Sequence, residues 1–283
     1  MTSPRSILSA WDLRPKKQLG QNFLADPSTA KMIVARAGLT SDDVVLEIGA
    51  GLGALTIPAA QTVKRVYAVE KDDHLAHALE SELGRQDIGN VIIINKDIFD
   101  LNIREIAGNE KEKLVILGNL PYNISSPVLF YLIDARDVVG RAVLMFQKEL
   151  ARRLLAGPGT KDYGRLSVML QYVADLKRIA SVSAHLFVPK PKVDSEVIEI
   201  SFKKVIENPV SDEKVLSEIV KAEEAIASGN IDTAKAEVKR AISTMDKEAD
   251  KGNVHRNNSA RHKSRLMKKL NKVAAASKSE KKK

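Results

Sequence analysis

The segment Asn119-Leu120-Pro121-Tyr122 has the residue types and order to bind a flat base through an amino group. It follows the apolar run 114–117, which predicts a buried strand. The side-chain carbonyl of Asn119 and the next backbone carbonyl can accept hydrogen bonds from an exocyclic amine. Pro121 stiffens the turn, and Tyr122 offers a ring on which a base can stack. The alternative is an ordinary strand-to-helix loop, since Asn and Pro are common loop residues.

A glycine-rich loop lies upstream of this segment. Residues 44–48 form a short apolar run of strand character, and Gly49 to Thr56 then lead into a predicted helix. Glycines let the backbone turn tightly and let a ligand approach it closely. The loop alone fits a dinucleotide equally well, because Gly49, Gly51 and Ala54 match the looser dinucleotide fingerprint.

Acidic residues follow the next two predicted strands. Glu70 comes directly after residues 65–69, at the spacing where an acid binds a pair of ribose hydroxyls. Asp97 follows residues 91–94, where an acid can meet an adenine amino group. Both positions suit either a dinucleotide or another adenosine-containing cofactor.

Ligand-type residues therefore sit at four successive strand ends: Glu47 with Gly49, then Glu70, Asp97 and Asn119. In an open α/β sheet, ligands bind at the carboxyl ends of the strands. A hydride-transfer enzyme has no use for Asn-Leu-Pro-Tyr at the fourth strand, whereas a methyltransferase acting on amino groups does. We predict an α/β, Rossmann-like methyltransferase domain with a mainly parallel sheet over residues 1–204.

These motifs resemble the KsgA/Dim-type ribosomal RNA adenine dimethyltransferases over about residues 11–204. The segments that match the family are 17–24 (KQLGQNFL), 47–56, 119–127 and 187–195 (FVPKPKVDS). The erythromycin-resistance methyltransferases share the motifs around Asn22, Gly49 and Asn119. The form LGQNFL, and the stretch 147–172 with KDYGRLS at 161–167, favour the bacterial KsgA branch.

The resemblance implies a site and a reaction. S-adenosylmethionine would be bound by Asn22, Leu24, Gly49, Glu70, Asp97 and Asn119. The target adenine would be bound by Asn119, by the backbone carbonyl of Leu120 and by Tyr122, with Phe187 closing its other face. The alternative for Phe187 is a plain core aromatic. The family adds two methyl groups to each of two adjacent adenines in the RNA of the small ribosomal subunit.

Composition excludes several other classes of protein. The chain has no cysteine, which rules out a disulfide, a thiolate nucleophile and a cysteine-rich zinc site. His74 and His77 lie three residues apart, but no third ligand is suggested, so we predict no metal site. No apolar stretch approaches the roughly 20 residues of a membrane span. The amino terminus lacks a signal pattern. We expect a cytoplasmic protein without a membrane segment, and a monomer.

The character of the sequence changes after residue 204. Residues 205–211, with Pro209, form a predicted linker, and residues 212–275 form a predicted helical, basic appendage of three helices. Asp232 is the expected N-cap of the second helix. Residues 276–283 form a predicted disordered, Lys-rich tail.

The appendage resembles the later helices of small-subunit ribosomal protein S-twenty. The matching segments are 222–230, 249–252 and 254–266 (VHRNNSARHKSRL). The basic amino-terminal helix of that family is missing, and so is the small helical domain that the dimethyltransferases use on RNA. The chain therefore resembles two ribosome-associated families joined together, and the loss of one helix predicts a weaker bundle.

All the excess positive charge of the chain lies at its carboxyl end. Residues 251–283 hold 12 Lys and Arg and one acid, a net charge of +11, whereas the whole chain carries +9. Such a segment is typical of a phosphate-binding arm, and the alternative is a solvated charged tail.

Two functions follow from the sequence. The first is a small-subunit rRNA adenine dimethyltransferase with a role in ribosome biogenesis, whose partner is ribosomal RNA or the pre-ribosomal small subunit. The second is a non-catalytic rRNA-binding or ribosome-assembly protein that uses the basic helical appendage.

Overall fold

The computed structural model describes residues 3–206, 212–228, 230–254 and 256–280, and most of the predicted linker, 207–211, lies outside these ranges. The chain divides into two compact units. The first comprises Met1–Leu155 and Val173–Lys204, and the second comprises Ala156–Tyr172 and Val205–Lys283. None of the described helices is long and apolar enough to span a membrane.

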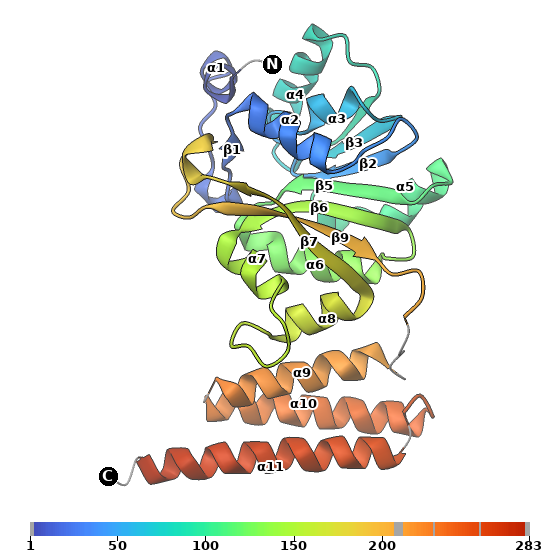
Figure 1. The fold of residues 1–283 in the computed structure, drawn as a ribbon, viewed down its shortest axis with the longest axis vertical. Helices are drawn as coiled ribbons and strands as arrows, with labels where there is room; N and C mark the ends of the chain where they lie inside the picture. Colours follow the sequence, from blue (N-terminus) through green and yellow to red (C-terminus); the bar gives the residue numbers. More distant parts are fainter. Residues whose placement is uncertain (1–2, 207–211, 229, 255, 281–283) are drawn as a thin grey trace. The chain divides into compact units, whose positions relative to one another are not determined.

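The first unit is built on a seven-stranded sheet with the strand order β4-β3-β2-β5-β6-β9-β7 in the described residues (Figure 1). Strands β2 to β6 pair in parallel, and β9 pairs antiparallel with both β6 and β7. The strands are β2 (Val44–Ile48), β3 (Arg65–Val69), β4 (Val91–Ile94), β5 (Leu114–Asn119), β6 (Val139–Gln147), β7 (Ala174–Val182) and β9 (Ser195–Phe202). The predicted mainly parallel, Rossmann-like fold is confirmed.

Strand boundaries agree closely with the sequence pattern. The predicted strands 44–48, 65–69 and 91–94 have the same bounds in the structure, and the run 114–117 extends to Asn119. The reason is burial: every residue of β2 is buried, as is all of β5 up to Asn119. Parallel strands covered on both faces appear in a sequence as short continuous apolar runs.

Helices cover both faces of the sheet (Figure 1). Apolar side chains of α2, α3 and α4 form one core cluster with alternate residues of the strands, including Val45, Val66, Leu117 and Val143. Figure 1 shows α5, α6 and α7 on the opposite face. The helices are α1 (Pro4–Ala10), α2 (Pro27–Arg36), α3 (Thr56–Ala60), α4 (Asp73–Arg85), α5 (Ile103–Glu110), α6 (Ser125–Asp134) and α7 (Lys148–Leu154).

Short elements complete this unit around the ends of the parallel strands. A two-stranded ribbon joins β1 (Phe23–Leu24) to β8 (Phe187–Val188). Single 3₁₀ turns occur as η1 (Lys17–Leu19), η2 (Ile98–Asp100), η3 (Tyr122–Ile124) and η4 (Ala184–Leu186).

The second unit is helical and has its own apolar core. It contains α8 (Arg165–Val173, whose last residue belongs to the first unit), α9 (Glu213–Ala227), α10 (Ile231–Asp250) and α11 (Arg256–Glu280). Its core is formed by one face of each of the last three helices, with Ala222, Val238, Met245 and Leu266 at most 1% exposed. The spacing of apolar residues every three or four positions explains these faces.

Details of the second unit depart from the sequence-based expectations. The N-cap of α10 is Asn230, whose side chain accepts a hydrogen bond from the Thr233 amide, and Asp232 lies in the first turn instead. Asn and Asp are comparable caps, so sequence alone did not separate them. The helix α11 continues to Glu280, where we predicted a disordered tail from residue 276, while residues 281–283 lie outside the described residues.

Segment 156–172, which we expected in the methyltransferase domain, belongs to the second unit. The cause is a set of contacts at the start of α8. The Arg165 backbone amide donates to the Glu224 carboxylate on α9, and the Arg165 guanidinium donates to Ser217 Oγ at 2.8 Å. An anion at a helix amino terminus satisfies free amides and suits the helix dipole. These contacts join α8 to the helical bundle of α9, α10 and α11.

Candidate functional site

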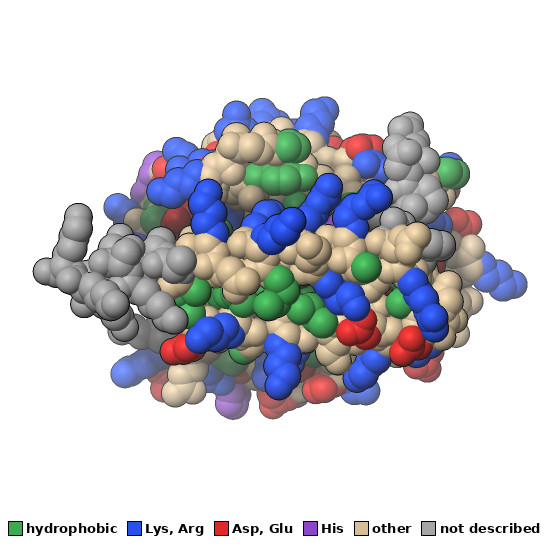
Figure 2. Space-filling view, turned by 90° about the horizontal axis from the view of Figure 1, so that it is seen from below, with side chains coloured by type: hydrophobic (Ala, Val, Ile, Leu, Met, Phe, Trp, Pro, Cys, Tyr) green, Lys and Arg blue, Asp and Glu red, His purple; other side chains and the backbone are tan. Residues whose placement is uncertain are grey.

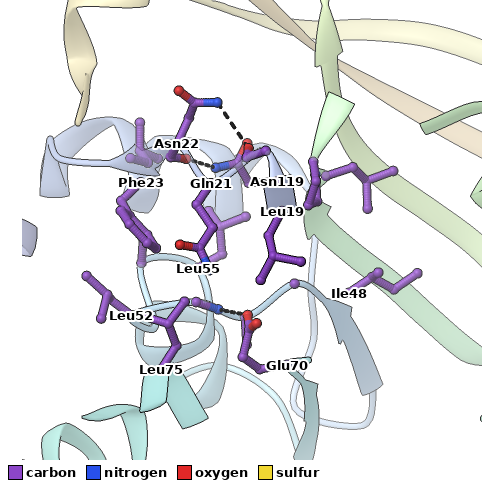
Figure 3. Close-up of a pocket in the computed structure, with 18 of the residues that line it drawn as sticks. Leu19, Gln21, Asn22, Phe23, Ile48, Leu52, Leu55, Glu70, Leu75 and Asn119 are labelled. Atoms are coloured by element: carbon purple, nitrogen blue, oxygen red, sulfur yellow. Dashed lines mark hydrogen bonds between the residues drawn. The ribbon is translucent and has the colours of Figure 1, made fainter. Parts of the chain in front are cut away.

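A cavity of about 250 Å³ opens at the carboxyl ends of β2, β3, β4 and β5 (Figure 3). All the residues predicted to bind the cofactor line it: Asn22, Leu24, Gly49, Glu70, Asp97 and Asn119. Leu120 and Tyr122, which were predicted to bind only the base, line it as well. Its apolar walls come from side chains that the sequence analysis did not single out, among them Leu19, Phe23, Leu52 and Leu75. Leu19, Phe23 and Leu52 lie in segments that match the family, but their apolar character is common to any core and did not mark them individually.

Asn119 is held in one orientation at the end of β5. Its side-chain amide nitrogen donates to the backbone oxygen of Asn22 at 3.0 Å. This bond uses the nitrogen and leaves the amide oxygen as the acceptor for a ligand. Figure 3 shows Asn22 and Asn119 facing each other at the cavity wall. Segments 97 residues apart thus meet, as the predicted joint role of these two asparagines requires.

The turn after Asn119 is packed against two glycines. A Cβ on Gly20 would lie 3.1 Å from Asn123 Oδ1, and Gly20 has a φ of +62°. Gly49 has a φ of +74°, and a Cβ there would lie 3.6 Å from Pro121 Cδ. Positive φ favours glycine because an L side chain is strained there. The glycines therefore let the N-terminal segment and the loop after β2 approach the turn closely.

Tyr122 lines the cavity, and its hydroxyl is anchored outside it. Tyr122 Oη lies 3.2 Å from Ser195 Oγ. Ser195 is fully buried at the start of β9, where it pairs with Gln147 on one side and Val182 on the other. Because strand pairing holds Ser195 on both sides, its hydrogen bond to Tyr122 restricts the orientation of the tyrosine ring. The sequence analysis did not identify Ser195, although it lies in a segment that matches the family.

Phe187 lies elsewhere. It pairs with Leu24 in the β1–β8 ribbon, is 2% exposed, and belongs to the core cluster on the α2–α4 face of the sheet. It is not among the residues that line the cavity. The geometry gives no support to the predicted role of Phe187 on the far face of a base. It agrees with the alternative of a core aromatic, because the ring is already surrounded by apolar side chains.

Glu70 is fixed by backbone amides. Its two carboxylate oxygens accept hydrogen bonds from the amides of Gly51 and Asp72, both at 2.8 Å. Burial raises the pKa of Glu70, and these two bonds oppose the rise. Each carboxylate oxygen has a second lone pair for a ligand hydroxyl, so the predicted ribose contact is compatible with this arrangement.

Asp97 is paired with a lysine that the sequence analysis missed. Lys71 Nζ donates to Asp97 Oδ2 at 2.7 Å, and the Phe99 amide donates to Oδ1 at 3.1 Å. The bond from Lys71 is the main cause that lowers the pKa of Asp97, so this acid is ionised and acts only as an acceptor. Lys71 lines the cavity as well. The sequence signal that could have placed Lys71 at the cavity is its position directly after Glu70.

Glu47 is the unsatisfied group of the cavity. It is 1% exposed in the middle of the sheet, and its Oε2 has no hydrogen-bond partner among the described residues. Burial raises the pKa of Glu47 to about 8, and the negative charge of Glu70 adds to the rise. A buried carboxyl oxygen without a partner is costly. A ligand that brings a positive or hydrogen-donating group to this wall would satisfy it.

Glu47 lies at a predicted strand end but is not among the predicted site residues. The sequence signal that could have marked Glu47 as a site residue is its place: it is an acid within an otherwise apolar strand, directly before the glycine loop. Within the described residues, no group of three or more His, Asp or Glu side chains is arranged to bind a metal ion.

The parallel sheet, the glycine loop, the acids at successive strand ends and the Asn-Leu-Pro-Tyr turn together define a Rossmann-like methyltransferase that uses S-adenosylmethionine. The cavity fits this cofactor: the unpartnered Oε2 of Glu47 suits its cationic part, and Glu70 and Asp97 would supply acceptors for its hydroxyl and amino groups.

Comparisons with known proteins identify the family. The model of the family "Ribosomal RNA adenine dimethylase" matches residues 13–271. The chain belongs to this family. The match extends beyond residue 204 into α11, further than the resemblance that we drew from the motifs.

Individual relatives agree with this assignment. The chain is 51% identical to "Ribosomal RNA small subunit methyltransferase A" of Desulforapulum autotrophicum over 222 residues, which covers 78% of each chain. Among solved structures, a dimethyladenosine transferase from Plasmodium falciparum has a TM-score of 0.63 and 29% identity, covering 71% of this chain and 70% of that one. The 23S rRNA methyltransferase ErmE has a TM-score of 0.58 and 28% identity, covering 74% and 80%.

Proposed function

We propose that this protein transfers methyl groups from S-adenosylmethionine to the exocyclic amino groups of adenines in small-subunit ribosomal RNA, and so acts in ribosome biogenesis. The observation that supports this most directly is the fixed amide of Asn119. Its nitrogen is bound to Asn22, and its oxygen is left as an acceptor at the wall of the cavity that holds the cofactor. The names of the curated relatives support the small-subunit substrate.

Bound S-adenosylmethionine supplies an activated methyl group, so the residues of the chain need to position the reactants rather than activate them. Proximity and orientation can lower a barrier by about 7–11 kcal/mol at most. Asn22, Leu24, Gly49, Glu70, Asp97 and Asn119 are the proposed cofactor contacts. We add Glu47 to them, because its Oε2 has no hydrogen-bond partner among the described residues.

The adenine amine is a poor nucleophile because its lone pair is delocalised into the ring. The amide oxygen of Asn119 and the backbone carbonyl of Leu120 would each accept one amino hydrogen, which favours a pyramidal nitrogen. The same two dipoles stabilise the positive charge that develops on that nitrogen during transfer. The Tyr122 ring adds a cation–π attraction of about 0.5–2 kcal/mol.

A duplex shields its bases, so the adenine must leave the stack to reach this cavity. Tyr122 gives it one stacking surface. The role of Phe187 at the other face stays a prediction, since Phe187 is 2% exposed and does not line the cavity. The methylated amine loses its proton after transfer, and water is a sufficient acceptor, so the proposal requires no general base.

The test is labelled methyl transfer from S-adenosylmethionine to under-methylated small ribosomal subunits, read as dimethyladenosine. Asn119→Ala should lower the rate by about 100-fold, the scale of losing one transition-state hydrogen-bonding group. Asn109→Ala, at an exposed position of α5, is the matched control and should transfer at the wild-type rate. Wild-type protein that binds the cofactor but leaves no label in the subunit would overturn the proposal.

One observation supports an additional RNA-binding role for the second unit. Arg261, Arg265, Lys268 and Lys272 are exposed on α11 and have no ion pair among the described residues. At about 100° per residue, their spacing places all four on one helix face. Figure 2 shows Lys and Arg side chains on the side of the molecule that carries α11. Other cations of α11 are neutralised: Lys263 pairs with Asp246 and Lys269 with Glu223.

We propose that this row of four cations binds the phosphate backbone of the RNA substrate. The predicted resemblance of residues 212–275 to ribosomal protein S-twenty stays a prediction, as does the non-catalytic alternative. A variant in which all four of these residues are replaced by Gln should bind RNA more weakly. The slope of its log affinity against log salt should be smaller by about 3. The same change at Lys235, Lys239, Arg240 and Lys247, which are exposed on α10, is the control.

A further inference from the structure

The segment from Lys16 to Leu24 forms one wall of the cofactor cavity but has little regular structure of its own. Residues 18–24 all line the cavity. The segment contains only the three-residue turn η1 and the two-residue strand β1. Phe23 and Leu24 anchor one end in apolar clusters. The position of the remaining part therefore depends on side-chain contacts with other elements.

Asp72 makes those contacts. Its side chain is only 3% exposed. Lys16 Nζ lies 2.8 Å from Asp72 Oδ2 and 2.9 Å from Oδ1, and Gln21 Nε2 donates to Oδ2 at 2.9 Å. The Lys16 backbone amide in turn donates to Gln21 Oε1 at 2.7 Å. Asp72 thus binds both ends of the loop 16–21.

From its position in the sequence, Asp72 is expected to cap the helix α4, but its side chain does not do so. It precedes α4 at the N-cap position, where an Asp side chain usually accepts hydrogen bonds from the first turn. It makes no capping hydrogen bond to α4, and its oxygens turn to Lys16 and Gln21 instead. Burial raises the pKa of Asp72, but the bonds from Lys16 and Gln21, the charge of Lys16 and a smaller effect of the His74 amide in the first turn of α4 outweigh burial and lower it overall, so the acid is charged.

The contacts of Asp72 connect the cofactor side of the cavity to the base side. The Asp72 amide donates to Glu70 Oε1 at 2.8 Å, and Glu70 Oε2 accepts from Gly51 in the glycine loop. The Asp72 carboxylate binds Gln21, and the next residue, Asn22, accepts the amide of Asn119 through its backbone oxygen. Figure 3 shows Gln21, Asn22, Asn119 and Glu70 around the same cavity.

We infer that Asp72 is a positioning residue: it holds the wall 16–22 against the cofactor and, through Asn22, sets the orientation of the base-binding amide of Asn119. The part that concerns Asn119 rests on the proposed function. The part that concerns the cofactor does not, because it can be measured without RNA.

The first test is cofactor binding by calorimetry to the full chain without RNA. Asp72→Asn keeps the size of the side chain but removes its charge. It should weaken S-adenosylmethionine binding about tenfold, the scale of hydrogen bonds to charged groups. Asp73→Asn, whose carboxylate is exposed at the next position, is the matched control and should bind like wild type. Lys16→Met should show part of the loss, and Lys16→Arg should restore it.

A residue that only stabilised the fold would lower the amount of active protein without changing the affinity. Amide exchange separates the two cases. In Asp72→Asn, residues 16–24 should exchange faster while α4 and β2 keep wild-type protection. Gln21→Met should lower affinity as well, and the double variant should lose less than the sum of the two single losses, because both changes break the contact between Asp72 and Gln21.

The link to Asn119 is tested by kinetics with under-methylated subunits. At saturating cofactor, Asp72→Asn should still show a lower kcat, since a misoriented Asn119 amide affects the transfer step. Cofactor affinity within twofold of wild type in Asp72→Asn would overturn the inference whether or not the wild type methylates subunits. Wild-type protein that never labels subunits would overturn the proposed function and leave the binding and exchange results to decide this inference.

Discussion

The hydroxyl of Tyr122 meets the hydroxyl of Ser195 at 3.2 Å, across 73 residues of sequence. Tyr122 follows the last residue of β5 by three positions, whereas Ser195 begins β9 and is fully buried. The ring proposed to stack on the substrate is therefore oriented by the far, antiparallel part of the sheet. This relationship leads to the first prediction.

Tyr122→Phe and Ser195→Ala each remove the same hydrogen bond while keeping the ring and the strand. Each should lower kcat about fivefold, corresponding to about 1 kcal/mol for a neutral hydrogen bond. The double variant should be no slower than either single variant, which a double-mutant cycle on methyl transfer would show. Ser201→Ala, on the same strand, is the control. Strictly additive losses would contradict the proposed orientation of the ring by Ser195.

Phe187→Leu distinguishes a core role from a base-contacting role. The structure places Phe187 in the core, so the substitution should lower the free energy of unfolding by about 1–1.5 kcal/mol. The kcat of the folded fraction should stay near wild type. Denaturant unfolding and methyl transfer on the same samples give both quantities. A large loss of kcat with unchanged stability would return Phe187 to the predicted base contact.

Glu47 predicts a pH dependence of stability. Its pKa is about 8 in the folded protein against an ordinary value of 4.5. Between these values the folded chain keeps a proton that the unfolded chain has lost, so this group makes stability fall as pH rises from 4.5 to about 8. Glu47→Gln should remove this part of the slope, and the variant should gain stability relative to wild type as pH rises. Denaturant unfolding across this range checks it.

The same carboxyl predicts how cofactor affinity varies with pH. A cationic ligand favours the charged form of Glu47, so the affinity of the wild type for S-adenosylmethionine should rise toward pH 8. Glu47→Gln should bind with an affinity that varies less over the same range. Calorimetry on both proteins measures the difference, and parallel pH curves would contradict the assignment of Glu47 to the cofactor.

Glu224 holds the start of α8 within the second unit. Glu224→Ala removes the acceptor of the Arg165 amide, so residues 156–172 should exchange their amides faster. The free energy of unfolding should fall by about 1 kcal/mol, as is typical of a lost helix cap. Glu223→Ala is the neighbouring control, because the Glu223 carboxylate contacts Lys269 on α11. Equal exchange at residues 156–172 in both variants would show that the Glu224 contact does not hold this segment.

The sequence by itself determined the parallel sheet and the polar side chains that its strand ends bring to the cavity. Buried parallel strands are short apolar runs, and their carboxyl ends meet along one edge of the sheet. Any ligand-type residue at such an end is therefore brought to the same place. Glu70, Asp97 and Asn119 line the cavity for this reason, and the glycine loop before α3 could be located by its composition.

Only the tertiary structure decided which side chains meet from distant segments. Phe187 belongs to the core cluster and pairs with Leu24 in the β1–β8 ribbon. Ser195 reaches Tyr122 only because β9 runs antiparallel to β6. Asp72 turns away from its own helix to Lys16 and Gln21, 56 and 51 residues distant. Such contacts depend on how the chain reverses and on which way each side chain points, and neither is contained in local sequence patterns.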